Sequence, residues 1–534
     1  MIKMKISSIF KYIFIIFAIG IIIYAGYKIY QNDKNNENEE KDEVVIEDTT
    51  IKDIRLGLTS YDTMNPLITN NKEILNIDSL IYEPLFKVNE DYSLEPCLAT
   101  ECSKTGDRTY IVKVNTGINW QDGTSFISKD IQFTIDTIKQ GNSIYKYNVT
   151  HIEQAEVIDA STIKLILDGE IPFFEYNLTF PIMSSSYYYG QNFYESDKIP
   201  IGTGRFKIAD ISSNSITLAR NIKWKAKNEK EEDMKLENIK INLYSSMGEA
   251  YNAFKIGNID LLNTSNQNFS DYIGTIGFTK NEYRGRQFDF LSFNCTDTIM
   301  QDIYVRKAIS YAIDKDNIVS SVYANKYDTA EYPLDYGNYL YEENGASSGY
   351  NIEQARATLE NGGWEYSNNK WKKEIDGYTR TLRLKIAVNK NNADRVAVAE
   401  NIKEQLENIG ISVTINKISE EQYSSYIENK DYQILLTGVY TGYSPDLTYY
   451  FGNNNLTNYF NDDMIKLINN AGIIRNESEL KEIYKQIYSK YKEDVPFIGL
   501  YRNKNITISS TSLVGTINAN NYSTFYGISE WYRK

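Results

Sequence analysis

The sequence predicts an α/β protein, because segments with the period of a strand and segments with the period of a helix alternate from residue 51 onward. The connections between these segments are short, as expected in compact α/β lobes. At 534 residues the chain is too long for one compact core, so we expect two or three domains. No internal repeat of fixed period is visible in the sequence.

The predicted strands have apolar residues at every second position, and the first contains Ile54, Leu56 and Leu58. Further strands of this kind are predicted at residues 239–243, 382–388 and 411–415. Apolar residues with helical spacing predict amphipathic helices near residues 250–254, 305–313 and 398–409. The first of these helices follows the capping-box sequence that starts at Ser246, and it ends before Gly257.

The composition is that of a folded protein that does not bind nucleic acid. Apolar residues make up 42% of the chain and charged residues 24%, which is ordinary for globular domains. The formal net charge of −14 leaves no excess of basic residues with which to bind phosphates. Tyrosine is abundant, with 45 residues, but Asn, Ile and Lys are abundant as well and proline is scarce. Because this joint bias is typical of AT-rich codon usage, the tyrosine content alone carries little functional information.

The few cysteines and the single histidine restrict the available chemistry. Cys97, Cys102 and Cys295 are too few for a disulfide framework; a Cys97–Cys102 bond stays open, and we favour partly buried thiols. His151 is the one histidine, so a zinc cluster is implausible, and we expect this residue in a loop or at the surface. No nucleotide-binding, metalloprotease or nucleophile-elbow motif is present, whereas a glycosidase-like pair of carboxylates stays open.

The first thirty residues predict a membrane anchor. Lys3, Lys5 and Lys11 precede an uncharged, mostly apolar run over residues 12–27. This run is close to the length of about 20 residues that spans a bilayer. The positive charge before it places the rest of the chain outside. The alternative is a signal peptide cleaved near residues 18–20, which we disfavour because the apolar run continues past that point.

The segment after this run predicts a tether. Residues 31–50 are acidic and Asn-rich and lack apolar periodicity, which is typical of a disordered linker. No cysteine precedes Cys97, so a lipid-modified cysteine beside the membrane segment is excluded. Residues 1–30 as anchor or signal and residues 31–50 as tether thus predict a protein at the outer face of the cytoplasmic membrane.

Several motifs occur in order along the folded part. LIYEPLF starts at Leu80, and PCLA, NWQDG and DIQF follow within residues 96–133. PIGTGRFKI starts at Pro200, KIGNIDLL starts at Lys255, and FN, VRKA and AID lie within residues 293–314. Together these motifs resemble those of the family 5 extracellular solute-binding proteins, the oligopeptide- and dipeptide-binding receptors of ABC importers. Each motif alone is weak, but their order over about residues 52–500 makes the resemblance specific.

The resemblance implies a type II periplasmic-binding-protein-like fold. In this fold two α/β lobes, joined by a hinge, close over a ligand, and an extra domain is inserted in the first lobe. We expect lobe I in three parts and lobe II in one. The predicted boundaries are residues 51–83, 200–285 and 500–534 for lobe I, residues 84–199 for the inserted domain, and residues 286–499 for lobe II.

Three conspicuous residues are expected to be structural. Trp120 stands before a Gln-Asp-Gly turn, and we expect it to clamp that turn and not to contact a ligand. Arg306 has apolar neighbours on its helix and is expected to pair with a carboxylate such as Asp314. Asp260 is expected to support the turn after Gly257.

The stretch YTGYSPDLTYYF, which starts at Tyr440, is predicted to form a wall of the ligand cleft. It is similar to the loop in which the peptide-binding members of the family place an aspartate that pairs with the free amine of the peptide. Here Val439 stands at the tryptophan position of that motif and Gly442 at the aspartate position, so the usual ionic anchor is missing. The predicted ligand contacts in this stretch are Tyr440, Thr441, Gly442, Tyr443 and Asp446.

Asp446 either replaces the missing aspartate from a shifted position or faces solvent. We favour the second possibility, because a turn fixed by proline does not easily reposition a side chain; the ligand would then lack an enclosed N-terminal charge. A second set of predicted contacts, at positions where the family lines the ligand backbone, follows the sequence MNPL and consists of Thr69, Asn70 and Asn71. We expect Tyr449, Tyr450 and Phe451 to pack in a helix or in the core.

The resemblance implies capture of a peptide, or of a similar small organic solute, for delivery to the membrane subunits of an ABC permease. We expect a monomer that has no enzymatic activity and needs no cofactor or metal. Two alternatives stay open: a tethered sensor of the same fold that takes no part in transport, and a cell-surface hydrolase that acts through a carboxylate pair.

Overall fold

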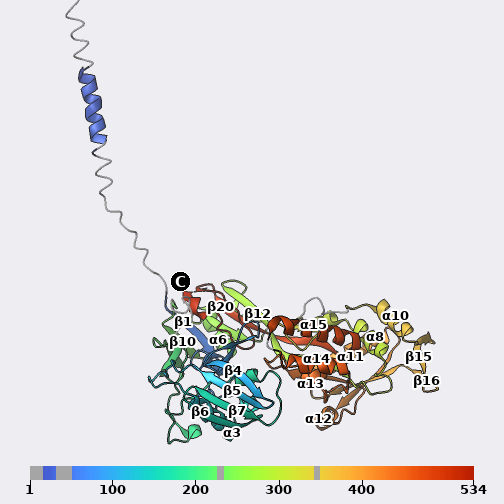
Figure 1. Ribbon diagram of the computed structural model, residues 1–534. Coiled ribbons are helices and arrows are strands. Elements are labelled where there is room, and N and C mark those ends of the chain that lie inside the picture. The colour runs from blue at the N-terminus through green and yellow to red at the C-terminus, as the bar shows by residue number, and fades with distance from the viewer. Residues whose placement is uncertain are drawn as a thin grey trace, which may run out of the picture. The chain divides into compact units, whose positions relative to one another are not determined.

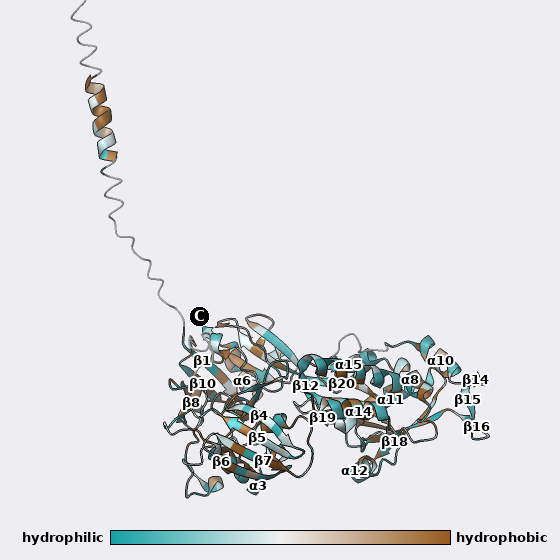
Figure 2. Ribbon diagram, viewed as in Figure 1, coloured by the Kyte–Doolittle hydropathy of each residue, from teal (hydrophilic) through white to brown (hydrophobic). Residues whose placement is uncertain are grey.

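The structure is a computed structural model (Figure 1), in which two compact units are distinguished: residues 1–50 and residues 51–534. It describes residues 16–29, 31, 51–224, 234–266, 268–341, 349–474 and 476–534. In the first unit, residues 16–29 form an exposed helix that is mostly hydrophobic (Figure 2). Among the described residues, no helix is both long enough and apolar enough to cross a membrane. The start of the predicted anchor and almost all of the predicted tether lie outside the described residues.

One sheet of eleven strands runs through the second unit (Figure 1). Its order is β18-β17-β19-β12-β20-β11-β1-β10-β9-β8, and β13 pairs with β20 outside this path. The strands are β1 (Asp53–Leu58), β8 (Phe206–Ile211), β9 (Ser215–Arg220), β10 (Asn238–Leu243), β11 (Leu261–Thr264), β12 (Phe278–Phe293), β13 (Tyr327–Thr329), β17 (Arg383–Asn389), β18 (Ser412–Ile418), β19 (Ile434–Tyr440) and β20 (Phe497–Ser510). The four strands predicted from alternating apolar residues are confirmed as β1, β10, β17 and β18.

The two long strands β12 and β20 connect the two halves of this sheet. They pair antiparallel, and β12 also pairs with β19 whereas β20 also pairs with β11. Their register shifts between Arg284 and Phe288, so that residues 285–287 of β12 lie opposite Asn503 alone. At this bulge, the side-chain Oδ1 of Asn503 accepts a hydrogen bond of 3.1 Å from the main-chain nitrogen of Gln287. A bulge bends a strand and disrupts its pairing locally, so the connection between the two halves is irregular at this position.

A separate antiparallel sheet, in the order β4-β5-β7-β6, lies beside α3 (Figure 1). Its strands are β4 (Ala99–Gly106), β5 (Thr109–Val114), β6 (Ile152–Asp159) and β7 (Thr162–Leu167). Helix α3 (Ser128–Gln140) packs on it because Ile131, Ile135 and Ile138 form one fully buried face. Short elements complete this region: β2 (Phe86–Val88), β3 (Leu94–Pro96), α4 (Lys146–Val149), η1 (Phe174–Leu178) and η2 (Phe193–Glu195).

Most of the helices between residues 303 and 494 begin at a side chain that caps their first turn. The caps of α8, α9, α10, α11, α12, α14 and α15 are Asp302, Asp314, Asn351, Asn392, Ser419, Asn461 and Asn476, and each accepts from a main-chain N–H of the helix. The helices are α8 (Ile303–Ala312), α9 (Lys315–Tyr323), α10 (Ile352–Asn361), α11 (Ala393–Glu407), α12 (Glu420–Asn429), α13 (Thr448–Phe451), α14 (Asp462–Ala471) and α15 (Glu477–Asp494). The predictions for residues 305–313 and 398–409 are confirmed as α8 and α11.

The remaining elements are short. A three-stranded sheet consists of β14 (Glu365–Ser367), β15 (Lys370–Ile375) and β16 (Tyr378–Thr381). The others are α2 (Lys72–Asp78), α6 (Met247–Lys255), α7 (Ser270–Ile273), β21 (Leu513–Val514), β22 (Tyr532–Arg533) and η4 (Ile528–Glu530). The helix predicted after Ser246 is confirmed as α6. Asp260, expected to support the turn after Gly257, instead binds the guanidinium of Arg55 in β1 at 2.7 and 3.0 Å.

Several hydrophobic clusters hold these elements together. One cluster joins β1 and β10 to the four-stranded sheet and α3. Two others join the strands and helices between about residues 288 and 501, and one of these also contains Phe173 and Tyr176 from the region of η1. The exact boundaries of the predicted lobes and of the inserted domain stay a prediction.

Candidate functional site

The two predicted sets of ligand contacts lie side by side. Tyr440 is the last residue of β19, and 69% of its surface is exposed. The ammonium nitrogen of Lys72, which directly follows Asn71 and begins α2, lies 5.5 Å from the centroid of the Tyr440 ring. A cation at this distance from a tyrosine ring is attracted to its face. The structure therefore brings together two stretches that are about 370 residues apart in the sequence.

The first set is organised by Asp62. Its carboxylate accepts hydrogen bonds from the hydroxyl of Thr69 (2.6 Å) and from the main-chain nitrogen of Asn70 (3.0 Å). Partial burial acts to raise the pKa of Asp62, but these hydrogen bonds outweigh it, so that the pKa is lowered. The side chain of Asn71 caps α2 by accepting from the main-chain nitrogen of Glu73 at 2.9 Å. Thr69 and Asn71 thus shape the loop, and Asn70 is the exposed member of the set.

Two arginines that sequence reasoning missed meet at Thr441. The Nε of Arg286 donates to the carbonyl oxygen of Thr441 at 2.7 Å, and the Nη1 of Arg502 donates to its hydroxyl at 3.0 Å. The guanidinium carbon of Arg286 also lies 4.6 Å from the centroid of the Tyr443 ring. Within the described part of the chain, no carboxylate forms an ion pair with Arg286. The stretch that follows Tyr440 therefore has the positively charged side chain of Arg286 bound to it.

Tyr443 is held in place from several sides. Its hydroxyl donates to the main-chain oxygen of Asn521 at 3.0 Å, and its ring packs edge-on against Tyr522 at 5.1 Å between centroids. Because Arg286 stacks on the same ring, Tyr443 has little freedom to move. This side chain can present a rigid aromatic surface to a ligand.

Gly442 and Asp446 bear on the missing ionic anchor. A Cβ placed on Gly442 would meet only the main-chain nitrogen of Ser444, at 3.8 Å, so the backbone leaves room for a side chain there. The Oδ1 of Asp446 accepts from the main-chain nitrogen of Thr448 at 2.9 Å and from its hydroxyl at 2.5 Å. Burial raises the pKa of Asp446, although these hydrogen bonds oppose the change. One oxygen of Asp446 is therefore engaged by Thr448, the first residue of α13 (Thr448–Phe451).

The three residues expected to pack in a helix or in the core, Tyr449, Tyr450 and Phe451, differ in their burial. Tyr450 and Phe451 are buried and belong to a hydrophobic cluster with Phe497, as predicted. Tyr449 lies in helix α13, as expected, but it is 48% exposed and does not pack in the core. The reason is the short helix α13, which turns neighbouring side chains to different sides.

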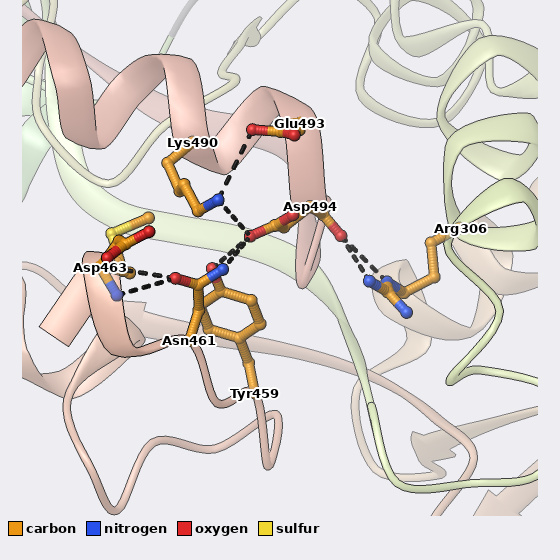
Figure 3. Close-up of polar contacts among 8 residues, drawn as sticks. Arg306, Tyr459, Asn461, Asp463, Lys490, Glu493 and Asp494 are labelled. Carbon is orange, nitrogen blue, oxygen red and sulfur yellow. Dashed lines mark hydrogen bonds and ion pairs between the residues drawn. The ribbon is translucent and has the colours of Figure 1, made fainter.

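Arg306 is structural, as expected, but its predicted carboxylate partner is wrong. Asp314 caps α9 instead. The guanidinium of Arg306 donates to main-chain carbonyl oxygens, at distances of 2.5 to 3.2 Å; these belong to Met300, Gln301, Asp494 and Val495. Figure 3 shows the contact with Asp494. Carbonyls at the end of a helix such as α15 have no partner within the helix, so a buried guanidinium satisfies them.

The other residues singled out in the sequence are Trp120, His151 and the three cysteines. Trp120 is 1% exposed, and its indole nitrogen donates to Asp130 at 3.1 Å, which confirms the structural role. The Nδ1 of His151 lies 3.1 Å from the carboxylate of Asp168, and both side chains are partly exposed. Cys97, Cys102 and Cys295 form no disulfide in the described part of the chain, so the open question of a Cys97–Cys102 bond is answered in favour of thiols.

Comparisons with known proteins identify the family. The family model "Bacterial extracellular solute-binding proteins, family 5 Middle" matches residues 93–461. The oligopeptide-binding protein AppA of Bacillus subtilis (strain 168) is 24% identical over 505 residues, which cover 87% of this chain and 88% of that protein. A glutathione-binding protein, GsiB of Pectobacterium atrosepticum, is 24% identical over 490 residues, covering 86% of this chain and 90% of the relative.

Solved structures show the same fold. HbpA2 from Haemophilus parasuis superposes with a TM-score of 0.76 at 18% identity, covering 90% of this chain and 100% of that chain. The B. subtilis AppA structure, in complex with a nonapeptide, has a TM-score of 0.55 at 21% identity and covers 90% of this chain and 99% of its own. The resemblance drawn from the sequence motifs is thereby confirmed. The chain belongs to the bacterial extracellular solute-binding proteins of family 5, and its fold is of the type II periplasmic-binding-protein-like α/β class.

Proposed function

We propose that this protein is the substrate-binding protein of an ABC importer and that it captures peptides. The observation that carries the proposal is the contact of Lys72 with the Tyr440 ring. It brings the two predicted ligand stretches next to each other, so that both can contact one ligand. The names of the relatives support the ligand class, since they include an oligopeptide-binding and a glutathione-binding protein, and glutathione is itself a peptide.

The proposed mechanism is closure without chemistry on the ligand. Lobe I (residues 51–83, 200–285 and 500–534) and lobe II (residues 286–499) move about the bulge between β12 and β20, and the inserted domain (residues 84–199) moves with lobe I. A ligand shifts this equilibrium only by its difference in affinity for the open and closed forms. The family consists of solute-binding proteins, which supports a role that is not enzymatic.

Within the site, Arg286 is the proposed receiver of an anionic group such as the C-terminal carboxylate of a peptide. Its Nε is held by Thr441, and its ring contact with Tyr443 fixes the plane of the guanidinium. Guanidinium groups bind carboxylates through two parallel hydrogen bonds, which orients the ligand as well as attracting it. Tyr440 and Tyr443 then supply aromatic surface along the ligand, and Asn70 supplies polar contacts from the opposite wall.

We further propose that the protein acts at the outer face of the cytoplasmic membrane as a monomer and delivers its ligand to the permease subunits. The lysines and the apolar run within residues 3–27 support an N-terminal anchor. N-terminal sequencing of the mature protein tests this point, because a chain that begins near Ile21 would show cleavage instead of anchoring.

The experiment that tests the function combines thermal unfolding with mass spectrometry. The purified protein is incubated with a pool of short synthetic peptides, and both its unfolding temperature and the peptide masses are followed. Ligand at about a hundredfold excess over Kd stabilises the native state by about 2.7 kcal/mol. We expect this stabilisation with unchanged peptides; peptides that become shorter in proportion to the protein added would refute the proposal.

A matched pair of tyrosines assigns the binding to the proposed site. Tyr440→Ala removes an exposed ring that has a cation 5.5 Å away, and Tyr378→Ala in β16 removes a ring that is 67% exposed with Arg380 at 5.6 Å. We expect only the first substitution to weaken the stabilisation by peptides. Equal effects of both would show that the site lies elsewhere.

A further inference from the structure

Among the described residues, Asp78 has a buried carboxylate with no hydrogen-bond partner on either oxygen. Asp78 ends α2, the helix that begins at Lys72 beside the proposed site, and it is 3% exposed. Buried polar groups in native proteins are nearly always paired. A carboxylate with two orphaned oxygens therefore needs an explanation.

The groups around Asp78 do not supply the missing partner. Its titratable neighbours are Asp62, Tyr61, Tyr82 and Tyr145, each close enough to interact with its charge. No lysine, arginine or histidine of the described chain forms an ion pair with it. Burial raises the pKa of Asp78 well above its usual value, and the charge of Asp62 adds to this change. Burial without a partner therefore favours the neutral form of Asp78 at pH values where free aspartate is ionised.

The same neighbours connect Asp78 to both walls of the proposed site. Asp62 holds Thr69 and Asn70 through hydrogen bonds. Burial raises the pKa of Tyr145, and the charges of Asp78, Tyr522 and Tyr443 contribute in that order. One tyrosine thus interacts with Asp78 and with Tyr443, which lies on the other wall.

We propose that Asp78 is the acid that receives a protonated amine of the ligand. Gly442 has no side chain for this role, and Oδ1 of Asp446 is engaged by Thr448. The inference rests on the proposed function and adds the ligand's charge to it. On binding, the carboxyl O–H bond of Asp78 breaks, its proton passes to solvent, and the carboxylate accepts N–H bonds from the ammonium group. The atoms and charges balance, since one neutral acid and one ammonium become an ion pair and one released proton.

The surroundings of Asp78 suit an ammonium group. An ammonium carries three donors and no acceptor, and Asp78 has two acceptor oxygens without partners. The side chains of Tyr61, Tyr82 and Tyr145 lie close enough to Asp78 to interact with its charge, and aromatic faces attract cations most strongly where water is excluded. Tyr61 is the most exposed of these rings, and in this proposal rotation of its side chain opens the way to the carboxylate. Such rotations are fast compared with domain closure.

The test compares each peptide of a synthetic pool with its N-acetylated form by calorimetry. We expect wild-type protein to bind the free amine at least about tenfold more tightly, which corresponds to about 1.4 kcal/mol. Asp78→Asn should bind both forms equally and keep the wild-type affinity for the acetylated form. Asp136→Asn is the control for the loss of one carboxylate elsewhere, because Asp136 is exposed and lies in α3 away from the proposed contacts.

A second measurement uses only wild-type protein, so it does not depend on how Asp78→Asn folds. Calorimetry at one pH in two buffers with different ionisation enthalpies gives the number of protons released on binding. We expect proton release with free-amine peptides and none with acetylated peptides. Preference for the free amine that persists in Asp78→Asn, or binding of both forms by wild type without preference, would overturn this inference alone. Failure of wild type to bind either form would overturn the proposed function as well.

Discussion

The bulge between β12 and β20 provides a direct test of the proposed hinge. A Cβ on Gly285 would lie 2.0 Å from the Oδ1 and 2.2 Å from the Cγ of Asn503. In Gly285→Ala the Asn503 side chain must therefore move away and lose the hydrogen bond that it accepts from the main-chain nitrogen of Gln287. A partly buried N–H without a partner costs about 1–3 kcal/mol. We expect Gly285→Ala to lower the free energy of unfolding by this amount.

A double-mutant cycle isolates this cause. In an Asn503→Ala background both the obstacle and the hydrogen bond are already absent, so Gly285→Ala should add little to the loss of stability. Gly169→Ala serves as the control, because a Cβ there meets no atom within 4 Å. The free energies come from urea denaturation of the four proteins and the control. Additive effects of the two substitutions would refute the reasoning.

The cycle also has a functional readout. If the bulge is the hinge, its distortion changes the fraction of protein in the binding-competent form, and the apparent Kd changes in proportion to that fraction. We expect Gly285→Ala to alter peptide affinity while Gly169→Ala does not. Unchanged affinity in a destabilised Gly285→Ala protein would place the hinge elsewhere.

The remaining predictions concern single side chains. Arg306→Met leaves main-chain carbonyls unpaired at the end of α15 and should lower the free energy of unfolding, measured in urea, by about 3 kcal/mol or more. Asp446→Ala should leave the preference for free-amine peptides unchanged in calorimetry, because its Oδ1 is engaged by Thr448; loss of that preference would contradict the expectation. Arg286→Gln should weaken peptides with a free C-terminal carboxylate and spare their amides, and equal losses would argue against the proposed contact. Asp78 has a folded-state pKa above its unfolded value, so the native state binds this proton more tightly and stability falls as pH rises from about 4 toward the folded pKa. Asp78→Asn should remove that slope from the pH dependence of unfolding.

Local pattern was sufficient for much of the fold. Helices α8 and α11 and strands β1, β10, β17 and β18 were predictable because the alternation of apolar residues is a property of each segment by itself. Trp120 was predictable for a similar reason, since its partner Asp130 lies ten residues further along the chain. The motifs that identified the family are short segments as well, so each can be found in the sequence without knowledge of the fold.

The contacts that failed or were missed depend on distant parts of the chain. Arg286 and Thr441 are 155 residues apart, and no local pattern links them. Arg306 binds main-chain carbonyls, which every residue type possesses, so its partners leave no trace in the sequence. The burial of Asp78 follows from the packing of α2 against distant elements, whereas in the sequence it is one polar residue on a helix with a polar face.

The position of charges in the site bears on how a ligand could drive closure. Asp78 lies in predicted lobe I and Arg286 in predicted lobe II. A group that contacts only one lobe binds the open and closed forms with the same affinity and shifts no equilibrium, however tightly it binds. A peptide held at its amine by Asp78 and at its carboxylate by Arg286 makes both contacts together only when the lobes approach. In the proposed mechanism the glycine at position 442 thus has a meaning: with Asp78 in lobe I and the Arg286 side chain held by Thr441 and Tyr443 of lobe II, the ligand's own two charges supply the difference in affinity that closes the cleft.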